Sequence, residues 1–401
     1  MRFGTNFSLV GKFNENAVIH ALRAMGPASQ TQIADATELS GQTVSAIVNS
    51  LTDRGYLREV RTESVGRGRP RIIMDIVPRA RYAIGVHVDP SVMTAVTLDL
   101  RGRVVSSASS EEVDPEDPDT SMASAADLVR QLMAVTSLSG DRLVGVSLAV
   151  PGPLDGGSET IGDSVWLPGW AGAPVGRQLS GNLGMPVPVV KDTLAAVIGE
   201  NWVRAGEVLE STMVFVYLGS GTGVGLSHHG EPLRGSSGNA GEIGTILLTL
   251  GAASRRSRSG LENDPVVMVE EAHERGILKG PLPGRTATTG ADKQFRTLCK
   301  LAGEGDIRSV EILEAAGGRI AEMVVMTSEL FDADMVVFGG PYWELVRPWY
   351  EPAAIAALDR PSARGPHPVE VSSTAMDKDV GAIGAASVVL DQRYVPRAPR
   401  R

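Results

Sequence analysis

Cysteine is almost absent from this chain of 401 residues, because Cys299 is the only one. A single cysteine excludes an intramolecular disulfide and any metal site built from several thiolates. No histidine motif accompanies Cys299, so we expect a packed thiol rather than a catalytic nucleophile. The cysteine content therefore predicts no cofactor and no metal site of the multi-thiolate kind.

Long hydrophobic runs are also missing. The sequence has no stretch of eighteen or more apolar residues, which a membrane-spanning helix would need. Its first residues, MRFGTNFSLVGKFNENAV, do not have the shape of a secretory signal. These absences predict a soluble, cytoplasmic protein with no membrane partner, and the length predicts more than one domain.

Positive charge is scarce overall but concentrated in one segment. The formal net charge is −9, which argues against a protein that coats nucleic acid over its whole surface. Between Arg54 and Arg81, however, eight arginines stand against only Glu59, Glu63 and Asp75. A basic segment in an acidic protein predicts one face that binds a polyanion.

Residues 13–76 show the pattern of a winged helix-turn-helix. Apolar residues at helical spacing run from Phe13 to Met25, and Ser29 stands three residues before Gln32 as in a capping box. Ser40 is placed to cap a third helix, and Gly55 to end it. Two alternating segments follow, with RTESVGRGRP between them. The alternative is a helical bundle with a solvated charged loop.

The DNA-contacting residues follow from that fold. Short or hydrogen-bonding side chains at the start of a recognition helix meet base edges in the major groove, which points to Gln42, Thr43 and Ser45. Arginines on a narrow, glycine-rich wing suit the minor groove or its phosphates, and the wing here carries Arg67, Arg69 and Arg71.

The remainder reads as an α/β body. Strand patterns alternate with helical ones, as in LVGVSLAVPGPLD followed by a helix over 175–183 and then VPVVKD. We expect an acidic surface loop at SSEEVDPEDPDTS, a helix near 125–135, a long helix near 310–331, and a disordered tail YVPRAPRR.

Ordered motifs along nearly the whole chain resemble the ROK family of sugar kinases and sugar-responsive repressors. They are the winged helix with GRGRP, then GVSLAVPGPLD, VKDTLAAVIGE, LGSGTGVGL with GSSGNAGEIG, and VVFGG followed by GAIGAA. The resemblance implies a winged helix over 1–78 and a two-lobed actin/hexokinase-like body over 79–401. The small lobe would comprise about 79–193 and 379–401, and the large lobe about 194–378.

The first phosphate turn departs from the family's kinases, which open with Asp-x-Gly-Gly-Thr. His87 falls at the acidic residue that serves Mg²⁺–ATP, and Asp89 and Pro90 fall at the glycines. Imidazole is a poor magnesium ligand, Asp89 would repel a phosphate, and Pro90 has no N–H to offer it. The second turn, 219–225, keeps its glycines. The resemblance therefore implies a protein that is not an enzyme.

The family's zinc motif is also lost. Thr245 falls at its histidine, while Ala253, Arg255 and Gly260 fall at its cysteines. None of these side chains supplies the imidazole or thiolate ligands of a structural zinc site. We therefore expect the loop ASRRSRSGLE to bind no zinc.

The sugar site is partly kept. Asp192 matches the family's catalytic base, Glu242 the sugar-binding Glu of GEIG, and Glu262 the Glu that ends the zinc motif, while Lys191 replaces an Asn. Carboxylates accept hydrogen bonds from vicinal hydroxyls. Asp192 could also cap the following helix, and Lys191 could either favour an acidic or phosphorylated effector or pair with a nearby carboxylate.

These features predict a transcriptional regulator, in particular a repressor, with two partners: operator DNA and a carbohydrate-like effector bound between the lobes. We expect it to act as a homodimer on an inverted repeat. One alternative is a sugar kinase with an added DNA-binding domain. Another is a regulator whose body has lost ligand binding and only dimerises.

Overall fold

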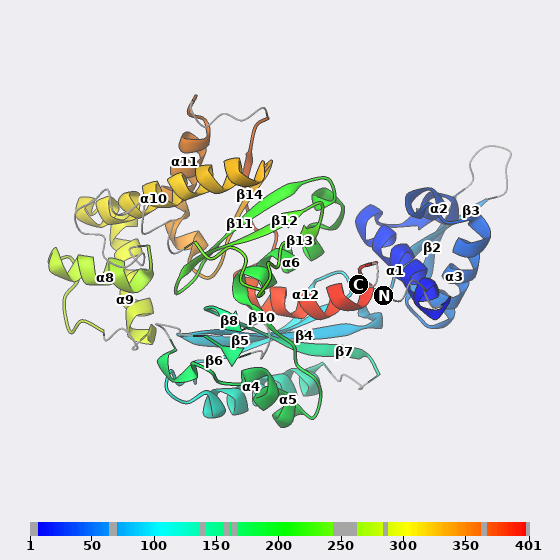
Figure 1. Ribbon diagram of the computed structural model, residues 1–401, viewed down its shortest axis with the longest axis horizontal. Coiled ribbons are helices and arrows are strands. Elements are labelled where there is room, and N and C mark those ends of the chain that lie inside the picture. The colour runs from blue at the N-terminus through cyan, green and yellow to red at the C-terminus, as the bar shows by residue number, and fades with distance from the viewer. Residues whose placement is uncertain are drawn as a thin grey trace.

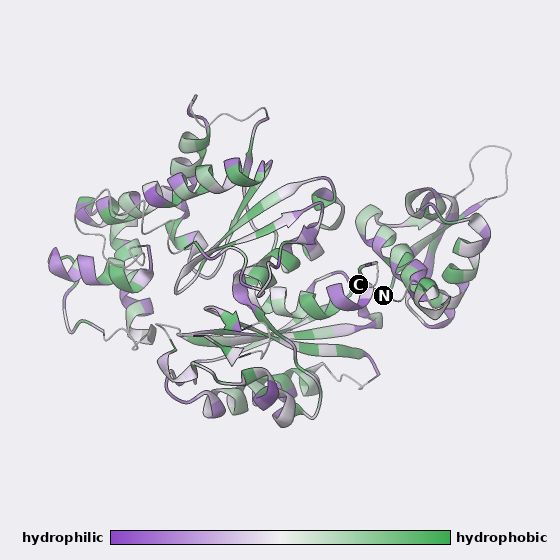
Figure 2. Ribbon diagram, in the orientation of Figure 1, coloured by the Kyte–Doolittle hydropathy of each residue, from purple (hydrophilic) through white to green (hydrophobic). Residues whose placement is uncertain are grey.

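The computed structural model describes residues 7–63, 70–136, 141–155, 160–162, 167–243, 263–283, 288–361 and 367–397. The N-terminal winged domain lies at one end of the molecule, and a body with two sheets forms the rest (Figure 1). Apolar residues follow the strands of both sheets, while the outer faces of the helices are mixed or polar (Figure 2). In the described part of the chain, no helix has the length and hydropathy needed to cross a bilayer.

The winged domain forms as the sequence predicts. Its elements are α1 (Phe7–Met25), β1 (Ala28–Ser29), α2 (Gln30–Thr37), α3 (Gly41–Asp53), β2 (Leu57–Glu63) and β3 (Arg71–Ile76). Ser29 and Gln32 make the expected capping box at α2, and the Ser40 hydroxyl accepts from the Thr43 N–H at α3. Gly55, with φ of 73°, lies just beyond the end of α3. The three strands pair in the order β1-β3-β2.

The first sheet of the body has the strand order β10-β7-β4-β5-β6. Its strands are β4 (Tyr82–Asp89), β5 (Val92–Asp99), β6 (Val104–Ser110), β7 (Leu143–Val150) and β10 (Val189–Lys191). Helices α4 (Pro118–Val135) and α5 (Val175–Leu183) cover one face through a core that includes Ile84, Val86 and Val88. The short elements around them are η1 (Pro78–Ala80), β8 (Leu154–Asp155), β9 (Thr160–Ile161) and η2 (Pro168–Trp170).

The second sheet has the order β13-β12-β11-β14-β15. Its strands are β11 (Thr212–Leu218), β12 (Thr222–His228), β13 (Glu231–Pro232), β14 (Met335–Gly339) and β15 (Glu370–Ser373). The helices on its outer side are α8 (Pro265–Glu274), α9 (Thr288–Gly303), α10 (Ile307–Phe331) and α11 (Trp343–Leu358). Cys299 is buried in their core, and burial raises the pKa of its thiol to about 12, so the expected packed thiol is confirmed.

Two helices lie between the sheets, α6 (Asp192–Arg204) and α12 (Val380–Tyr394), and η3 (Ala205–Val208) extends the first of them. Small residues let them approach closely (Figure 1). A Cβ added at Gly384 would lie 2.3 Å from the Ala195 carbonyl oxygen of α6, and one added at Gly85 of β4 would lie 2.1 Å from the Ala382 carbonyl oxygen of α12. The GAIGAA motif is therefore the packing surface of α12.

The winged domain shares a hydrophobic core with these central helices. Val18 and Leu22 of α1 belong to the same buried cluster as Trp202 of α6 and Tyr394 of α12. The amide of Asn16 donates to the Arg393 carbonyl at 3.0 Å, and the rings of Tyr56 and Tyr394 meet edge to face. The DNA-binding unit is thus packed against the body rather than joined to it by a bare linker.

Two segments differ from the sequence-based expectation. Helix α4 begins at Pro118 rather than near 125, because Asp117 accepts hydrogen bonds from the N–H groups of Asp119 and Thr120, and Pro118 suits the first helical turn. The end of the acidic strip is therefore helical, not loop. The tail is also ordered as far as Arg397, whose guanidinium binds the Asp391 carboxylate at 2.6 and 2.8 Å; residues 398–401 lie outside the described residues.

Candidate functional site

The amino-terminal end of α3 presents the expected base-contacting residues. Gln42 is exposed, and Thr43 and Ser45 are partly exposed. The Ser40 cap fixes this end, since its Oγ lies 2.8 Å from the Thr43 hydroxyl and 3.2 Å from the Thr43 backbone nitrogen. Val44, Val48 and Leu51 occupy the opposite, buried side of the helix. These buried residues pack α3 against the rest of the winged domain, and the polar residues at its amino-terminal end remain accessible.

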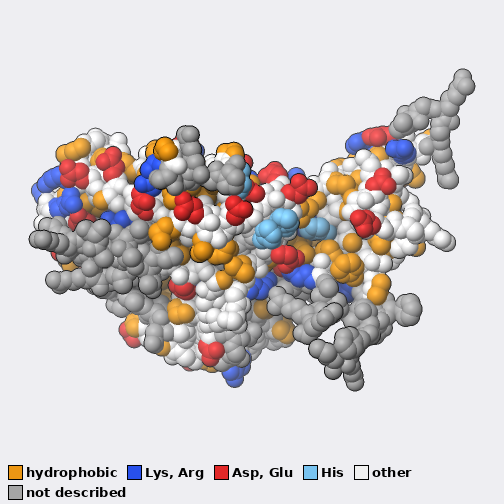
Figure 3. Space-filling model, turned by 45° about the horizontal axis from the view of Figure 1, so that its top comes forward, with side chains coloured by type: hydrophobic (Ala, Val, Ile, Leu, Met, Phe, Trp, Pro, Cys, Tyr) orange, Lys and Arg blue, Asp and Glu red, His pale blue; other side chains and the backbone are white. Residues whose placement is uncertain are grey.

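The wing is described only at its base. Arg67 and Arg69 lie outside the described residues, while Arg71 opens β3 and is exposed. Arg71 is paired in register with Glu63 of β2, and Arg61 forms an ion pair of 2.7 Å with that same glutamate. Basic side chains accordingly lie next to the start of the wing (Figure 3).

Lys191 and Glu242 form an ion pair between the end of a strand in the first sheet and the segment that follows the second sheet's β13. Lys191 ends β10 of the first sheet and is buried, while Glu242 follows the second sheet's β13 and its side chain is 51% exposed. Their Nζ and Oε1 atoms are 2.6 Å apart. Of the two roles left open for Lys191, the structure shows the pairing with a nearby carboxylate. The exposed carboxylate keeps lone pairs free for a ligand's hydroxyl groups.

Asp192 lies next to this pair, at the first residue of α6. It does not cap the helix as one reading of the sequence suggested, because Lys191 is the N-cap residue. Among the described residues, the one hydrogen bond that Asp192 accepts comes from the neighbouring Thr193 N–H, at 2.7 Å. Burial raises the pKa of Asp192 to about 6, against the lowering influence of Lys191; the charges of Glu242 and Asp89 raise it further. A buried carboxyl with a raised pKa therefore stands beside the Lys191–Glu242 pair.

This raised pKa predicts how Asp192 affects stability. The pKa is about 6 when folded and 3.8 when unfolded, so the folded state binds more protons in between, and stability falls as pH rises through 6. We expect Asp192→Asn to raise the free energy of unfolding at pH 7.5 by up to about 3 kcal/mol, and by less at pH 5. Urea denaturation at both pH values measures this difference.

The control is Asp127→Asn on α4, where the carboxylate is exposed. It should change stability little at either pH, because an exposed ion pair contributes little. An equal gain from Asp192→Asn at pH 5 and pH 7.5 would contradict the assigned titration.

The first phosphate turn is occupied by a carboxylate from the protein itself. Asp89 is buried, and its Oδ1 accepts from the N–H and hydroxyl of Ser91 at 3.0 and 2.7 Å. The Ser220 hydroxyl, from the second phosphate turn, lies 2.9 and 3.0 Å from the two Asp89 oxygens. The Asp89 carboxylate thus joins the two turns that the family resemblance assigned to phosphate binding.

His87 is enclosed beside that carboxylate. Burial lowers the pKa of His87, against the raising effect of Asp89. Its Nε2 lies 3.4 Å from the hydroxyl of Tyr217 on β11, whose own pKa is raised well above its ordinary value by burial. Neither an imidazole nor a neutral phenol supplies the carboxylate oxygen by which proteins usually bind magnesium.

Several residues of the cleft were not singled out from the sequence. Asn239 donates to the Leu154 carbonyl at 2.6 Å and accepts from the Leu154 N–H at 2.7 Å, which ties the GNAGEIG segment to the loop after β7. Ser220 and Tyr217 make the contacts described above. Ser220 lies in the LGSGTGVGL motif and Asn239 in the GNAGEIG motif, both of which the sequence analysis identified. The hydrogen bonds that these two residues make were not predicted.

Glu262, the third carboxylate expected at this site, belongs to a segment outside the described residues. Thr245 and the positions of the lost zinc motif, Ala253, Arg255 and Gly260, also lie outside the described residues. Lys191 also lines a pocket of about 260 Å³ between β10, the segment 234–238 and α12. Of the expected effector residues, the structure therefore brings together Lys191, Asp192 and Glu242.

The winged domain and the body each match a known protein family. The ROK family model matches residues 84–392, and the MarR family model matches residues 13–68. The DNA-binding transcriptional dual regulator NagC of Escherichia coli is 26% identical over 344 residues, which cover 84% of this chain and 83% of NagC.

Two solved structures share the fold. A ROK family transcriptional regulator described as a homologue of the E. coli MLC protein superposes with a TM-score of 0.73 at 18% identity, covering 97% of this chain and 98% of that one. A ROK glucokinase from Streptomyces griseus, in complex with glucose and AMPPNP, gives 0.59 at 22% identity and covers 77% and 98%. The first likeness includes the winged domain's share of the chain; the second covers about the length of the body.

Proposed function

This chain belongs to the ROK family, and from that premise we propose that it is a transcriptional repressor that binds operator DNA and responds to a sugar or sugar derivative. Residues 1–78 would bind DNA, and 79–401 would bind the effector and form a homodimer in the cytoplasm. The observation that carries the proposal is a winged-helix domain packed on a body in which the Asp89 carboxylate binds the Ser220 hydroxyl of the second glycine-containing turn.

The winged domain supports DNA binding through its shape and its charge. The capped start of α3 leaves Gln42, Thr43 and Ser45 accessible, as a recognition helix requires. Arg71 and the sequence of the wing supply positive charge beside it. A two-fold dimer would place two such units on an inverted repeat and so double the contacts.

The body supports binding rather than phosphoryl transfer. Phosphoryl transfer depends on positioning the γ-phosphate and neutralising its charge. Asp89 instead adds a negative charge there and already uses the Ser220 hydroxyl. Asp192 retains a carboxyl that could accept a proton, but we propose that no phosphoryl donor is positioned for it.

The cleft suits a polyhydroxylated effector. Glu242 and Asp192 present carboxyl oxygens from two different lobes, and Glu262 is the third residue that we propose for this site. Another relative of this chain, 26% identical over 344 residues, is named N-acetylglucosamine repressor, and we therefore propose an amino sugar as the first candidate class. Lys191 is engaged by Glu242, so an acidic effector would have to compete for it.

Helix α6 offers a route from the effector to the DNA-binding domain. It starts at Lys191 and Asp192 in the cleft and ends at Trp202 and Arg204, where α1 packs. At about 1.5 Å per residue, its thirteen residues span roughly 20 Å. A ligand that binds one position of the α6 start more tightly would therefore shift the position of the winged domain on the body. The free energy of that shift cannot exceed the difference in the ligand's affinity for the two positions.

The test combines ligand binding with DNA binding. Thermal-shift measurements with glucose, N-acetylglucosamine, N-acetylmannosamine and their 6-phosphates identify the best ligand, and calorimetry then compares wild type with Glu242→Gln. We expect the variant to bind at least about tenfold more weakly, because a charge-assisted hydrogen bond contributes about 1.5–3 kcal/mol. The ligand should also change operator affinity of the wild type about five- to 150-fold.

Glu314→Gln on the exposed side of α10 is the matched control and should bind the ligand as wild type does. Unfolding of each variant is measured too, since Lys191 loses its partner in Glu242→Gln. Equal binding by Glu242→Gln would place the site elsewhere. Steady ADP production from ATP and a sugar, above that of Asp192→Asn, would favour the alternative of a sugar kinase with an added DNA-binding domain.

A further inference from the structure

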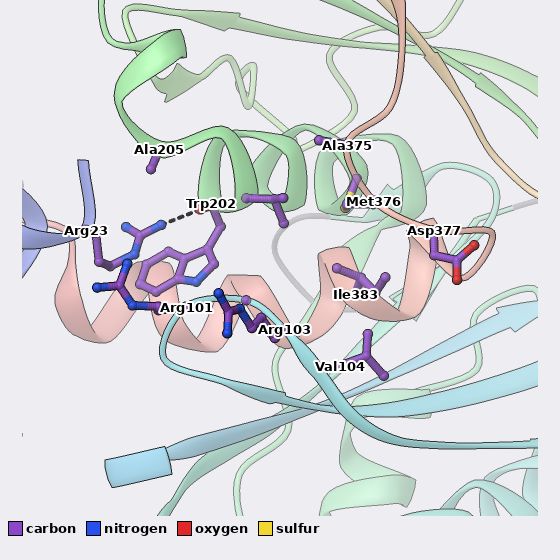
Figure 4. Close-up of a pocket in the computed structure, with 12 residues that line it drawn as sticks. Arg23, Arg101, Arg103, Val104, Trp202, Ala205, Ala375, Met376, Asp377 and Ile383 are labelled. Carbon is purple, nitrogen blue, oxygen red and sulfur yellow. Dashed lines mark hydrogen bonds between the residues drawn. The ribbon is translucent and has the colours of Figure 1, made fainter. Parts of the chain in front are cut away.

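A cavity of about 550 Å³ lies where the winged domain meets the body, apart from the cleft between the sheets. Arg23 of α1 borders it on one side, and the β5–β6 turn, the end of α6 and α12 border it on the others (Figure 4). Its volume lies within the range of small-molecule sites. Three arginines from two separate segments line it: Arg23 of α1, and Arg101 and Arg103 of the β5–β6 turn.

Arg23 is a buried charge without a counter-ion. Only 8% of the residue is exposed, and no ion pair joins it to a carboxylate among the described residues. Its guanidinium donates to the Trp202 carbonyl and stacks on the Trp202 ring, 3.3 Å from the ring centre. Burial lowers the pKa of Arg23 to about 9, in spite of the more distant Asp391. Burying an unpaired charge is costly, so this position favours an external anion.

The other two arginines differ in how free they are. Arg101 forms an ion pair with Asp75 of β3 and so also joins the body to the winged domain. Arg103 is exposed, and its guanidinium makes no hydrogen bond or ion pair with the described part of the protein. Among the lining residues, Asp377 is the one acid. The cavity therefore carries an excess of positive charge.

The remaining walls are apolar or neutral. Val104, Val203, Met376 and Ile383 line the cavity beside the arginines. The indole nitrogen of Trp202 is buried and has no hydrogen-bond partner in the described structure. A ligand here would meet guanidinium groups at one end and apolar side chains at the other.

We propose that this cavity binds a small phosphorylated metabolite, whose phosphate group lies between Arg23 and Arg103 and whose remainder contacts the apolar wall. Guanidinium groups bind phosphate with paired, charge-assisted hydrogen bonds, which suits them to this task. Helix α3 lies on the side of the winged domain away from the body (Figure 1). The cavity therefore does not face the DNA that α3 would read.

Binding here would fix the winged domain on the body. The phosphate would link Arg23 of α1 to Arg103 of the β5–β6 turn. It would add to two contacts between the winged domain and the body, that of Arg101 with Asp75 of β3 and that of Arg23 with Trp202 of α6. A ligand that binds one arrangement of two domains more tightly increases the population of that arrangement. The cavity would thus be a second effector site, and its occupation does not depend on the sugar cleft.

Calorimetry of the full-length protein with inorganic phosphate and with glucose 6-phosphate tests the proposal, with glucose as the neutral comparison and chloride holding the ionic strength constant. We expect phosphate to bind, and Arg103→Gln to weaken binding about tenfold or more. Arg23→Met should do the same. It replaces a buried charge by an apolar chain but loses the hydrogen bond to the Trp202 carbonyl, so urea denaturation is measured beside binding.

Two controls separate this site from the rest of the protein. Arg177→Gln on α5 makes the same change of charge at an exposed position and should leave binding unchanged. Glu242→Gln should also leave inorganic phosphate binding unchanged, so failure of the sugar cleft and failure of this site are distinguishable. Equal weakening by Arg103→Gln and Arg177→Gln, or no phosphate binding by the wild type, would overturn the proposal.

Discussion

Replacing Arg67, Arg69 and Arg71 together by alanine is expected to weaken DNA binding roughly a hundredfold or more at moderate salt. It should also flatten the dependence of log K on log salt by about three units, because each lost phosphate contact releases about one counter-ion fewer. The DNA site is first selected with the full-length protein from a random duplex pool. Fluorescence anisotropy between 50 and 200 mM salt then measures affinity and slope.

A matched variant separates the wing from overall charge. Replacing Arg177, Arg308 and Arg347, three exposed arginines of the body, removes the same charge and should leave the slope nearly unchanged. Gln42→Ala should mainly alter which duplexes are selected, since base contacts specify while phosphate contacts position. A wing variant with the wild-type slope would show that the wing does not touch the DNA backbone.

Gly384→Ala is expected to destabilise the body by about 3 kcal/mol or more, although alanine is the better helix former. The added Cβ would lie 2.3 Å from the Ala195 carbonyl oxygen, and backbone of α6 cannot move aside as a flexible side chain would. Urea denaturation of the full-length protein measures the loss.

The same substitution at Gly318 serves as its control. Gly318 lies on the exposed side of α10, and no atom lies within 4 Å of an added Cβ. Gly318→Ala should therefore raise the free energy of unfolding by about 0.5–1 kcal/mol. If both variants moved stability in the same direction, the close approach of α6 and α12 would not be what Gly384 provides.

Local chemistry made much of the fold predictable. The capping residues Ser29 and Ser40 bind groups only three residues further along the chain, so their role can be predicted from the local sequence. Both helix caps form as expected. The start of α4 was placed too late because the acidic strip looked like a solvated loop, whereas Asp117 turns it into a helix start. Arg397 is ordered by Asp391 and Glu231, and the glutamate lies far away along the chain.

The sites depend more on tertiary contacts, which explains what the sequence left open. Lys191 and Glu242 are 51 residues apart, so their ion pair appears only when the two sheets face each other. Asp89 was expected to repel phosphate, but its bond to Ser220 could not be inferred from either turn alone. The junction cavity takes its arginines from two distant segments, and no local motif marks it.

The shared core of α1, α6 and α12 has a consequence for how such regulators can be recombined. A chimera cut at residue 78 would move the winged domain to another body without the surface on which it packs. The body left behind would expose Trp202 and Tyr394, or bury them against a foreign helix. A transferable cassette would instead need to carry the partner faces of α6 and α12 with it. Exchange of DNA specificity is then easier by editing the start of α3 than by swapping whole domains.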